Sequence, residues 1–139
     1  MTTATRADRA TDDRRVAIVE VGPRDGLQNE RVFVDTAAKV RFVETLAAAG
    51  VRDVEVSSFV HPKAVPQLSD AEAVFASLTR IEGVRYSALV PNLHGLERAL
   101  RCSLDEIAVF TGSTDSFVGK NIRMTVAESL ERFAPVVPA

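Results

Sequence analysis

Arg24 and Asp25 are adjacent side chains whose types suit the control of negative charge during a reaction. An aspartate carboxylate is a hard oxygen ligand for Mg²⁺ or Mn²⁺, and a guanidinium presents a rigid fork of donors to a developing oxyanion. A third candidate, Glu55, lies inside an apolar run, where an unpaired carboxylate is unfavourable to bury. By themselves, the Arg-Asp pair also fits a simple turn, and Glu55 also fits a strand-end carboxylate paired with a neighbouring Lys or Arg.

Strand-like and helix-like segments alternate along the chain and place these residues at strand ends. The predicted strands are 16–21, 51–58, 84–90 and 106–110, and the predicted helices are 36–49, 69–79, 94–102 and one that opens at 125. This alternation predicts an α/β fold with a parallel sheet and right-handed crossovers. The pattern alone fits either a half barrel or a small doubly wound sheet. Polar residues gather at the strand carboxyl ends, the active face of both folds: Arg24, Asp25, Glu55, Ser57, Ser58, Asn92, Thr111 and Ser113.

Local signals mark the ends of several predicted helices. Gly50 follows the last apolar position of the first helix, where a C-terminal cap is expected. Two capping boxes are predicted, Ser69 with Glu72 and Thr125 with Glu128. The segment 111–123, between the fourth strand and the last helix, is predicted to be a loop.

Composition limits the classes of partner. The 139 residues are 46% hydrophobic and 26% charged, as in globular proteins, and the formal net charge of −2 gives no reason to expect nucleic acid or an anionic membrane. No run approaches the roughly 20 apolar residues that span a bilayer. The single cysteine, Cys102, excludes an internal disulfide and fits a reducing cytoplasm. Residues 1–15 are polar and contain acidic side chains, which predicts a disordered tail rather than a signal or transit peptide, on a cytoplasmic chain.

Two segments carry a family resemblance. The run 22–30, Gly-Pro-Arg-Asp-Gly-Leu-Gln-Asn-Glu, and the run 54–63, Val-Glu-Val-Ser-Ser-Phe-Val-His-Pro-Lys, resemble the 3-hydroxy-3-methylglutaryl-CoA lyases of the DRE-type metallolyase superfamily, which have a pyruvate carboxyltransferase-like domain. Synthases of the superfamily usually have Thr-Leu-Arg-Asp-Gly at the place of the first run, so the residues found here favour the lyase branch. The resemblance implies a partial (β/α)8 TIM barrel, with residues 16–139 as its amino-terminal half and four βα units.

The resemblance also implies roles for individual residues. Asp25 matches the aspartate that ligates Mg²⁺ or Mn²⁺, and Arg24 matches the arginine over the substrate thioester oxygen, where it would stabilise an enolate. Glu55 matches an active-site glutamate that assists orientation and proton handling, and we predict Arg24 as its electrostatic partner. Gln28 is expected near the acyl-CoA substrate. The implied reaction cleaves 3-hydroxy-3-methylglutaryl-CoA to acetoacetate and acetyl-CoA, usually in leucine breakdown.

The implied remainder of the barrel has consequences for this chain. In the family it supplies two metal-binding histidines, an asparagine ligand and a mobile cysteine loop, so we expect weak cation binding and negligible turnover from this chain. Open sheet edges predict self-association or pairing with a complementary half barrel. A fragment, a truncated gene model and a split product all remain open. The alternatives are another acyl-CoA or 2-oxo-acid lyase or synthase of the superfamily, and a non-catalytic half-barrel interaction module.

Overall fold

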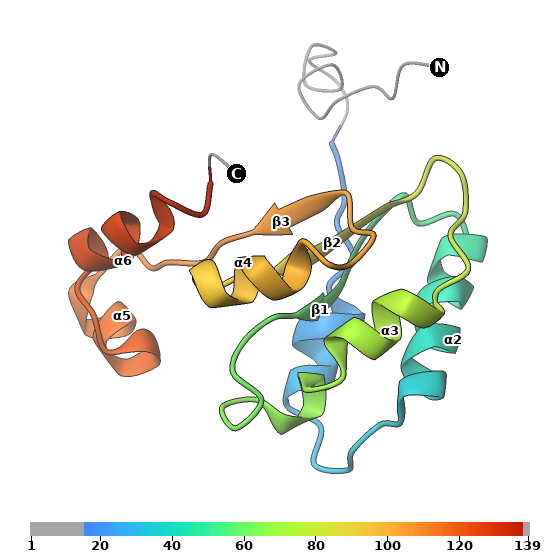
Figure 1. Cartoon of the computed structure of the whole chain (residues 1–139), viewed down its shortest axis with the longest axis horizontal. Helices are drawn as coiled ribbons and strands as arrows, with labels where there is room; N and C mark the ends of the chain where they lie inside the picture. Colours follow the sequence, from blue (N-terminus) through green and yellow to red (C-terminus); the bar gives the residue numbers. More distant parts are fainter. Residues whose placement is uncertain (1–15, 138–139) are drawn as a thin grey trace.

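A parallel sheet with helices on its connections forms the centre of the computed structural model, which describes residues 16–137 (Figure 1). Its three strands lie in the order β1, β2, β3, and both pairings are parallel. The elements of the sheet and its crossovers are α2 (Thr36–Ala48), β1 (Asp53–Ser58), α3 (Ala71–Ser77), β2 (Arg85–Leu89), α4 (Leu93–Ala99) and β3 (Glu106–Ala108). The predicted α/β class with parallel strands is therefore confirmed. The predicted tail, 1–15, lies outside the described residues.

The prediction of a full strand over 16–21 is wrong in extent. This segment makes one parallel bridge, between Glu20 and Val54, with backbone hydrogen bonds of 2.9 and 2.8 Å that join Glu20 to β1. Directly afterwards, the carbonyl of Val21 accepts from amides of the following turn instead of from a strand neighbour. Earlier in the segment Ile18 remains 76% exposed, so packing does not favour further pairing there.

A second correction concerns the segment after β3. The predicted loop 111–123 contains the helix α5 (Asp115–Ile122), which lies beside α6 (Val126–Phe133) at one end of the molecule (Figure 1). Thr114 caps α5, since its side chain accepts from the amide of Phe117, and Arg123 ends it in the left-handed conformation at φ 57°. The cap, rather than a long apolar stripe, marks this short helix.

The predicted helix ends are confirmed in two cases out of three. Gly50 follows α2 with φ +101°, a conformation that glycine adopts without strain, and Thr125 with Glu128 forms a complete capping box on α6. The Ser69 box is wrong. The N-cap residue of α3 is Asp70, without a side-chain cap bond, because its carboxylate instead accepts from the side chains of Thr36 and Lys39 on α2.

The sheet has an apolar face and a polar face, because successive side chains alternate along each strand. The apolar face packs with α2, α3 and α4 in a core formed by the buried residues Val40, Val43, Ala47, Val54, Val56, Phe59, Ala71, Val74, Phe75, Val84, Tyr86, Ala88, Val90, Leu96, Ala99 and Val136. The polar face lines a hollow of about 240 Å³, here called the sheet hollow, with Val19, Val21, Asp53, Glu55, Arg85, Ser87, Glu106, Ile107 and Ala108. Polar groups that could do chemistry are thus placed opposite the core.

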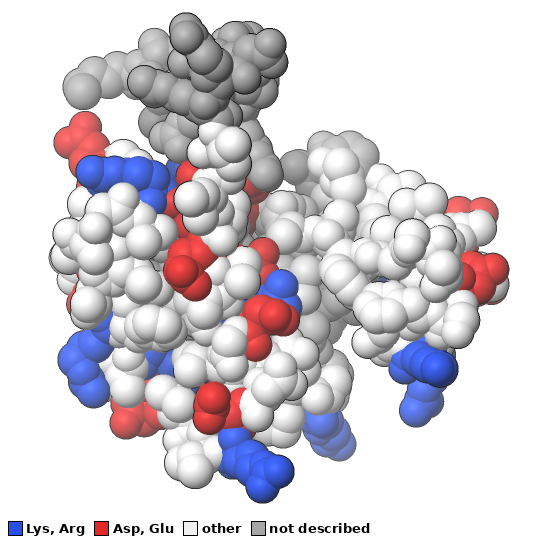
Figure 2. Space-filling view, turned by 180° about the vertical axis from the view of Figure 1, so that it is seen from behind, with Lys and Arg blue, Asp and Glu red and all other residues white. Residues whose placement is uncertain are grey.

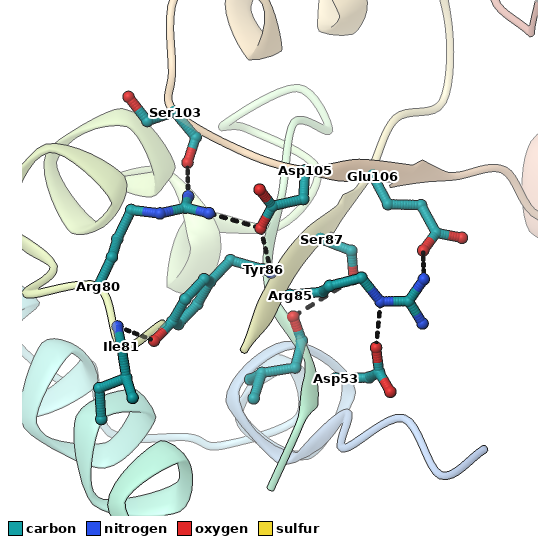
Figure 3. A network of polar contacts seen from close by, with 10 residues as sticks. Asp53, Arg80, Ile81, Arg85, Tyr86, Ser87, Ser103, Asp105 and Glu106 are labelled. Carbon is teal, nitrogen blue, oxygen red and sulfur yellow. Dashed lines mark hydrogen bonds and ion pairs between the residues drawn. The ribbon is translucent and has the colours of Figure 1, made fainter. Parts of the chain in front are cut away.

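Charged residues join the strands at their amino ends (Figure 3). Arg85 pairs with Asp53 at 2.5 Å across β1 and β2, and approaches Glu106 of β3 at 3.8 Å. The hydrogen bond from Arg85 to Asp53 raises the pKa of that guanidinium above its ordinary value. Asp105 adds a further link, because its carboxylate accepts from the amide of Tyr86 at 2.8 Å. These contacts fix the amino ends of the three strands on the same polar face as Glu55.

Acidic and basic side chains are interspersed over the face seen in Figure 2, which agrees with the small net charge of the chain. Within the part of the chain that the structure describes, none of the helices combines the length and apolar character needed for a membrane span.

Candidate active site

The candidate site begins at a one-turn π-helix, η1 (Gly22–Gly26), that follows the bridge to β1. The amides of Arg24, Asp25 and Gly26 all point to the carbonyl of Val21, at 3.1, 2.7 and 3.3 Å. Such wide turns are rare and frequently occur at functional sites. Here the turn brings two consecutive charged side chains to the carboxyl end of the bridging segment.

Gly22 leaves room for the side chains of Glu20 and Phe42 at the start of this turn. Its amide donates to Glu20 Oε1 at 2.6 Å, and a Cβ at this position would lie 2.8 Å from that oxygen and 3.3 Å from the ring of Phe42. A larger residue would push the Glu20 carboxylate away from the backbone it binds. The glycine of the sequence signature therefore has a local structural reason.

Arg24 joins the two predicted carboxylates. Its Nε donates to Glu55 Oε1, and its Nη1 donates to Asp25 Oδ1 at 2.7 Å. The side chains of Arg24 and Glu55 are 17% and 9% exposed, whereas that of Asp25 is 56% exposed. The predicted pairing of Arg24 with Glu55 is therefore confirmed. Low exposure strengthens this ion pair relative to one in water, and the contact with Asp25 is the one open to solvent.

Glu55 reaches this position from the middle of β1, on the polar face of the sheet. All six residues of the strand are buried, so the guanidinium of Arg24 compensates a carboxylate that would otherwise be unfavourable there. The arrangement leaves a fixed cationic group at the rim of the sheet. Chemically, it can orient an oxygen-rich ligand and stabilise negative charge that develops on it.

Gln28, the fourth predicted residue, lies just beyond η1 and lines a different hollow. This loop hollow of about 400 Å³ is lined by Gln28, Asn29, Glu30, Arg31, Phe33, Ala64, Val65, Pro66 and Gln67. It shares no lining residue with the sheet hollow. The structure thus brings Asp25 and Glu55 each into contact with Arg24, and it places Gln28 in the lining of a separate hollow.

Asp25 is a single carboxylate that could bind a divalent cation. Among residues 16–137, no group of three or more His, Cys, Asp or Glu side chains is placed to hold a metal ion. One oxygen of Asp25 also accepts from Arg24. Mg²⁺ and Mn²⁺ prefer several oxygen ligands, so the described residues fit one position of a coordination shell and not a complete site.

Other residues noted at strand ends have local structural roles. Asn92 caps α4 by accepting from the amide of Gly95 at 2.9 Å, and Thr111 shares a hydrogen bond of 2.5 Å with Ser129. Lys120 and Asn121, which lie in the segment predicted to be a loop, are exposed residues of α5.

The histidines and the cysteine also lie apart from Arg24 and Glu55. His61 is in a loop, where its Nδ1 accepts from the amide of Lys63 at 3.2 Å, and His94 is in the first turn of α4, as predicted. Cys102 is half-buried against the core, and burial raises the pKa of its thiol above the ordinary value. A raised thiol pKa disfavours the thiolate, which agrees with a packing role.

A buried polar cluster beside the loop hollow was missed by the sequence analysis. Gln67 and Lys39 are 6% and 3% exposed, and Lys39 Nζ donates to the carbonyl of Gln67 and to Asp70 Oδ1 at 2.6 Å. The signal that could have indicated it is Lys39 itself. A lysine four residues before Val43 lies on the buried stripe of α2, where a charge requires a partner.

Fold and site together define an α/β protein built from part of a TIM barrel, with a charged site at the carboxyl end of the sheet. The chain belongs to the HMGL-like family, whose model matches residues 15–139. It is 48% identical over 126 residues to a 3-hydroxy-3-isohexenylglutaryl-CoA/hydroxymethylglutaryl-CoA lyase of Pseudomonas aeruginosa, a match that covers 91% of this chain and 42% of the relative.

Solved structures agree with this assignment. The HMG-CoA lyase from Brucella melitensis is 50% identical with a TM-score of 0.86, over 88% of this chain and 44% of that chain. An HMG-CoA lyase from Acinetobacter baumannii, in complex with coenzyme A and 3-methylmalate, is 38% identical with a TM-score of 0.82, over 86% of this chain and 39% of that one. The chain thus spans less than half the length of these relatives. The recognised family and the TIM-barrel class are confirmed.

Proposed function

We propose that this chain forms the enolate-stabilising part of a 3-hydroxy-3-methylglutaryl-CoA lyase. The complete enzyme would cleave 3-hydroxy-3-methylglutaryl-CoA to acetoacetate and acetyl-CoA. The observation that carries the proposal is the placement of Arg24 between Glu55 and Asp25 on a π-turn at the rim of the sheet. Membership of a family whose relatives are named as lyases supports it.

In this proposal Arg24 supplies positive charge where the thioester oxygen becomes an enolate. A guanidinium already fixed by Glu55 needs little reorganisation when that charge develops, which is the main source of electrostatic catalysis. Glu55 holds the fork of Arg24 in place and assists proton handling at the substrate. Because Glu55 is nearly buried, its orientation is set by β1 rather than by solvent.

Asp25 is proposed as one ligand of the divalent cation, Mg²⁺ or Mn²⁺, in the complete enzyme. When bound, that cation would add Lewis-acid charge near the substrate oxygens. Gln28 is proposed to contact the acyl-CoA from the wall of the loop hollow. With one carboxylate of this kind, the chain is expected to bind the cation weakly and to turn over negligibly.

The test is a completed barrel, made by joining residues 16–133 to the remaining units of the Pseudomonas aeruginosa relative. We expect cation-dependent formation of acetyl-CoA from 3-hydroxy-3-methylglutaryl-CoA, and a fall in kcat of about 10²–10³-fold for Arg24→Met. The exposed Arg101→Met serves as the matched control with near-normal kcat. A folded chimera without lyase activity, or equal rates for the two variants, would contradict the proposal. 3-Hydroxy-3-isohexenylglutaryl-CoA, the other substrate in the name of the Pseudomonas aeruginosa relative, is assayed in parallel to compare the two acyl groups.

A further inference from the structure

The side chain of Gln67 bonds to a backbone segment far away in the sequence. Its Oε1 accepts from the amide of Val34 at 3.0 Å, and its Nε2 donates to the carbonyl of Val32 at 3.0 Å. The two partners lie on alternate residues of one segment, so the amide group of Gln67 binds it as a neighbouring strand would. Among side chains, a carboxamide suits this pairing because it offers both a donor and an acceptor.

Gln67 is itself held in place by α2. The carbonyl of Gln67 accepts from Lys39 Nζ, which also pairs with Asp70 at 2.6 Å, and Asp70 accepts from the hydroxyl of Thr36 at 2.7 Å. The ammonium of Lys39 lies 4.5 Å from the ring centroid of Phe33, which adds a cation–π contact to the same segment. The short helix η2 (Pro66–Leu68) is thus fixed to α2 before its side chain reaches the loop.

The segment that Gln67 binds continues directly from one wall of the loop hollow. Residues 28–31 and 33 form one wall of that hollow, called here the 28–33 wall, and residues 64–67 form the other. Gln67 therefore links the two walls by direct hydrogen bonds. The position of the first wall therefore depends on Gln67, a side chain outside the charged site. This matters for the ligand because Gln28, the proposed acyl-CoA contact, lies on that wall.

We propose that Gln67 is a positioning residue, which holds the 28–33 wall of the loop hollow in the conformation that receives the acyl-CoA. The inference rests on the proposed function for the identity of the ligand. It adds a residue that acts through the loop, without contact to the reacting atoms. A loss of Gln67 should free the wall and weaken ligand binding while the sheet and the Arg24–Glu55 pair remain.

The first measurement follows the loop itself, without any ligand, in the 139-residue chain. For Gln67→Ala we expect amide exchange at Val34 to rise about tenfold, the effect of one lost hydrogen bond, with faster tryptic cleavage after the exposed Arg31. Gln67→Glu keeps the acceptor for Val34 but sets a carboxylate oxygen against the carbonyl of Val32 in a buried position, so exchange at Val34 should rise with this variant as well. The matched control is Asp105→Ala, which also removes a side-chain acceptor of a backbone amide, at the other end of the sheet.

The second measurement is the Kd of coenzyme A for the same four proteins, at equal folded fraction. We expect Gln67→Ala to raise it about tenfold, in step with the exchange at Val34, and Asp105→Ala to leave it unchanged. Unchanged exchange at Val34, a loosened loop with unaltered Kd, or an equal effect of the control would overturn the proposal. If the unaltered chain fails to bind coenzyme A, the loop hollow of this chain is not an acyl-CoA site by itself, and the exchange data still decide whether Gln67 holds the wall.

Discussion

At the scale of single residues, the Arg24–Glu55 pair predicts a large and specific loss of stability. Arg24→Ala leaves the Glu55 carboxylate buried without its cation, and we expect a loss of about 2–3 kcal/mol in the free energy of unfolding, below the range for fully buried pairs because Arg24 is 17% exposed. In the Glu55→Gln background, the same substitution should cost about 1 kcal/mol or less, since a neutral amide tolerates the site better. Urea denaturation of the unaltered chain, Arg24→Ala, Glu55→Gln and the double variant measures the coupling energy of the pair.

Arg101→Ala is the control for this cycle, because Arg101 is exposed and its loss should change the free energy of unfolding by at most about 0.5 kcal/mol. Equal losses from Arg24→Ala in both backgrounds would show that the pair in the structure carries no coupling energy. Such a result would also contradict the claim that Glu55 holds the Arg24 guanidinium in place, on which the proposed electrostatic role depends.

The predicted residues of the site were accessible from the sequence because their chemistry is local. A nine-residue run contains Arg24, Asp25 and Gln28, and Glu55 stands out as a carboxylate in an apolar strand. The hydrogen bonds of the Gln67 side chain could not be predicted from the sequence. Their backbone partners are 33 and 35 residues away, and the residues around Gln67 are typical of a turn. Only the tertiary fold brings such a side chain to a distant backbone.

At the scale of the elements, the amino end of α4 lies unusually close to the chain that leaves β1. A Cβ on Gly95 would lie 2.9 Å from the carbonyl of Phe59 and 3.1 Å from the ring of Pro91. Gly95→Ala should therefore lower the free energy of unfolding by about 1–3 kcal/mol, despite the better helix propensity of alanine. Gly119→Ala in α5 is the matched control. Its nearest heavy atom would be 3.8 Å away, so stabilisation by up to about 1 kcal/mol is expected.

Both glycine variants are compared by thermal and urea unfolding. If Gly95→Ala stabilised the chain as much as Gly119→Ala, the close approach of α4 to the end of β1 would be contradicted. The comparison separates backbone crowding from helix propensity, because the same substitution is made in two helices.

The contact between α3 and α4 predicts a pH dependence of stability. Arg98 donates to both carboxylate oxygens of Glu72, at 2.6 and 2.8 Å, and these hydrogen bonds lower the pKa of Glu72 from its ordinary value of 4.5. A lowered folded-state pKa stabilises the fold above the unfolded pKa, and this contribution is lost as the pH falls through the folded value. Because Glu72 is 43% exposed, the contribution is about 1 kcal/mol or less.

Urea unfolding of the unaltered chain and Glu72→Gln, from pH 7 to pH 3, measures this contribution. Their difference should be constant near neutrality and shrink below about pH 4.5. The exposed Glu97→Gln is the control, with a small difference throughout. A difference between the chain and Glu72→Gln that persists unchanged at pH 3 would show that the ion pair does not contribute.

Element order could be predicted more securely than element length. Alternating apolar runs located the helices α2, α3 and α4, the strands β1 and β2 between them, and β3 after α4. The segment 16–21 has the same composition as a buried strand, yet it makes one bridge, because pairing depends on neighbours that a local pattern does not contain. Similarly, α5 is defined by its Thr114 cap and Arg123 end, which are weak signals in a loop-like sequence.

At the scale of the whole molecule, large apolar side chains remain exposed beside the sheet. Ile18, on the segment that pairs with β1, is 76% exposed, and Phe110, just after β3, is 47% exposed. Sheet edges with apolar side chains favour association with other chains. We therefore expect concentration-dependent self-association of the chain, measured by sedimentation velocity.

The sheet-edge origin of this association is tested with matched substitutions. Ile18→Lys should shift the chain toward the monomer, raising the apparent dissociation constant about tenfold or more, since a charge would have to be buried at the contact. Leu100→Lys, at a similarly exposed position (69%) on the end of α4, should leave the apparent dissociation constant nearly unchanged. A chain that stays monomeric at every concentration would contradict self-association. If both lysine substitutions raised the apparent dissociation constant equally, a general gain in solubility would explain both, and the sheet edge would not be the site of self-association.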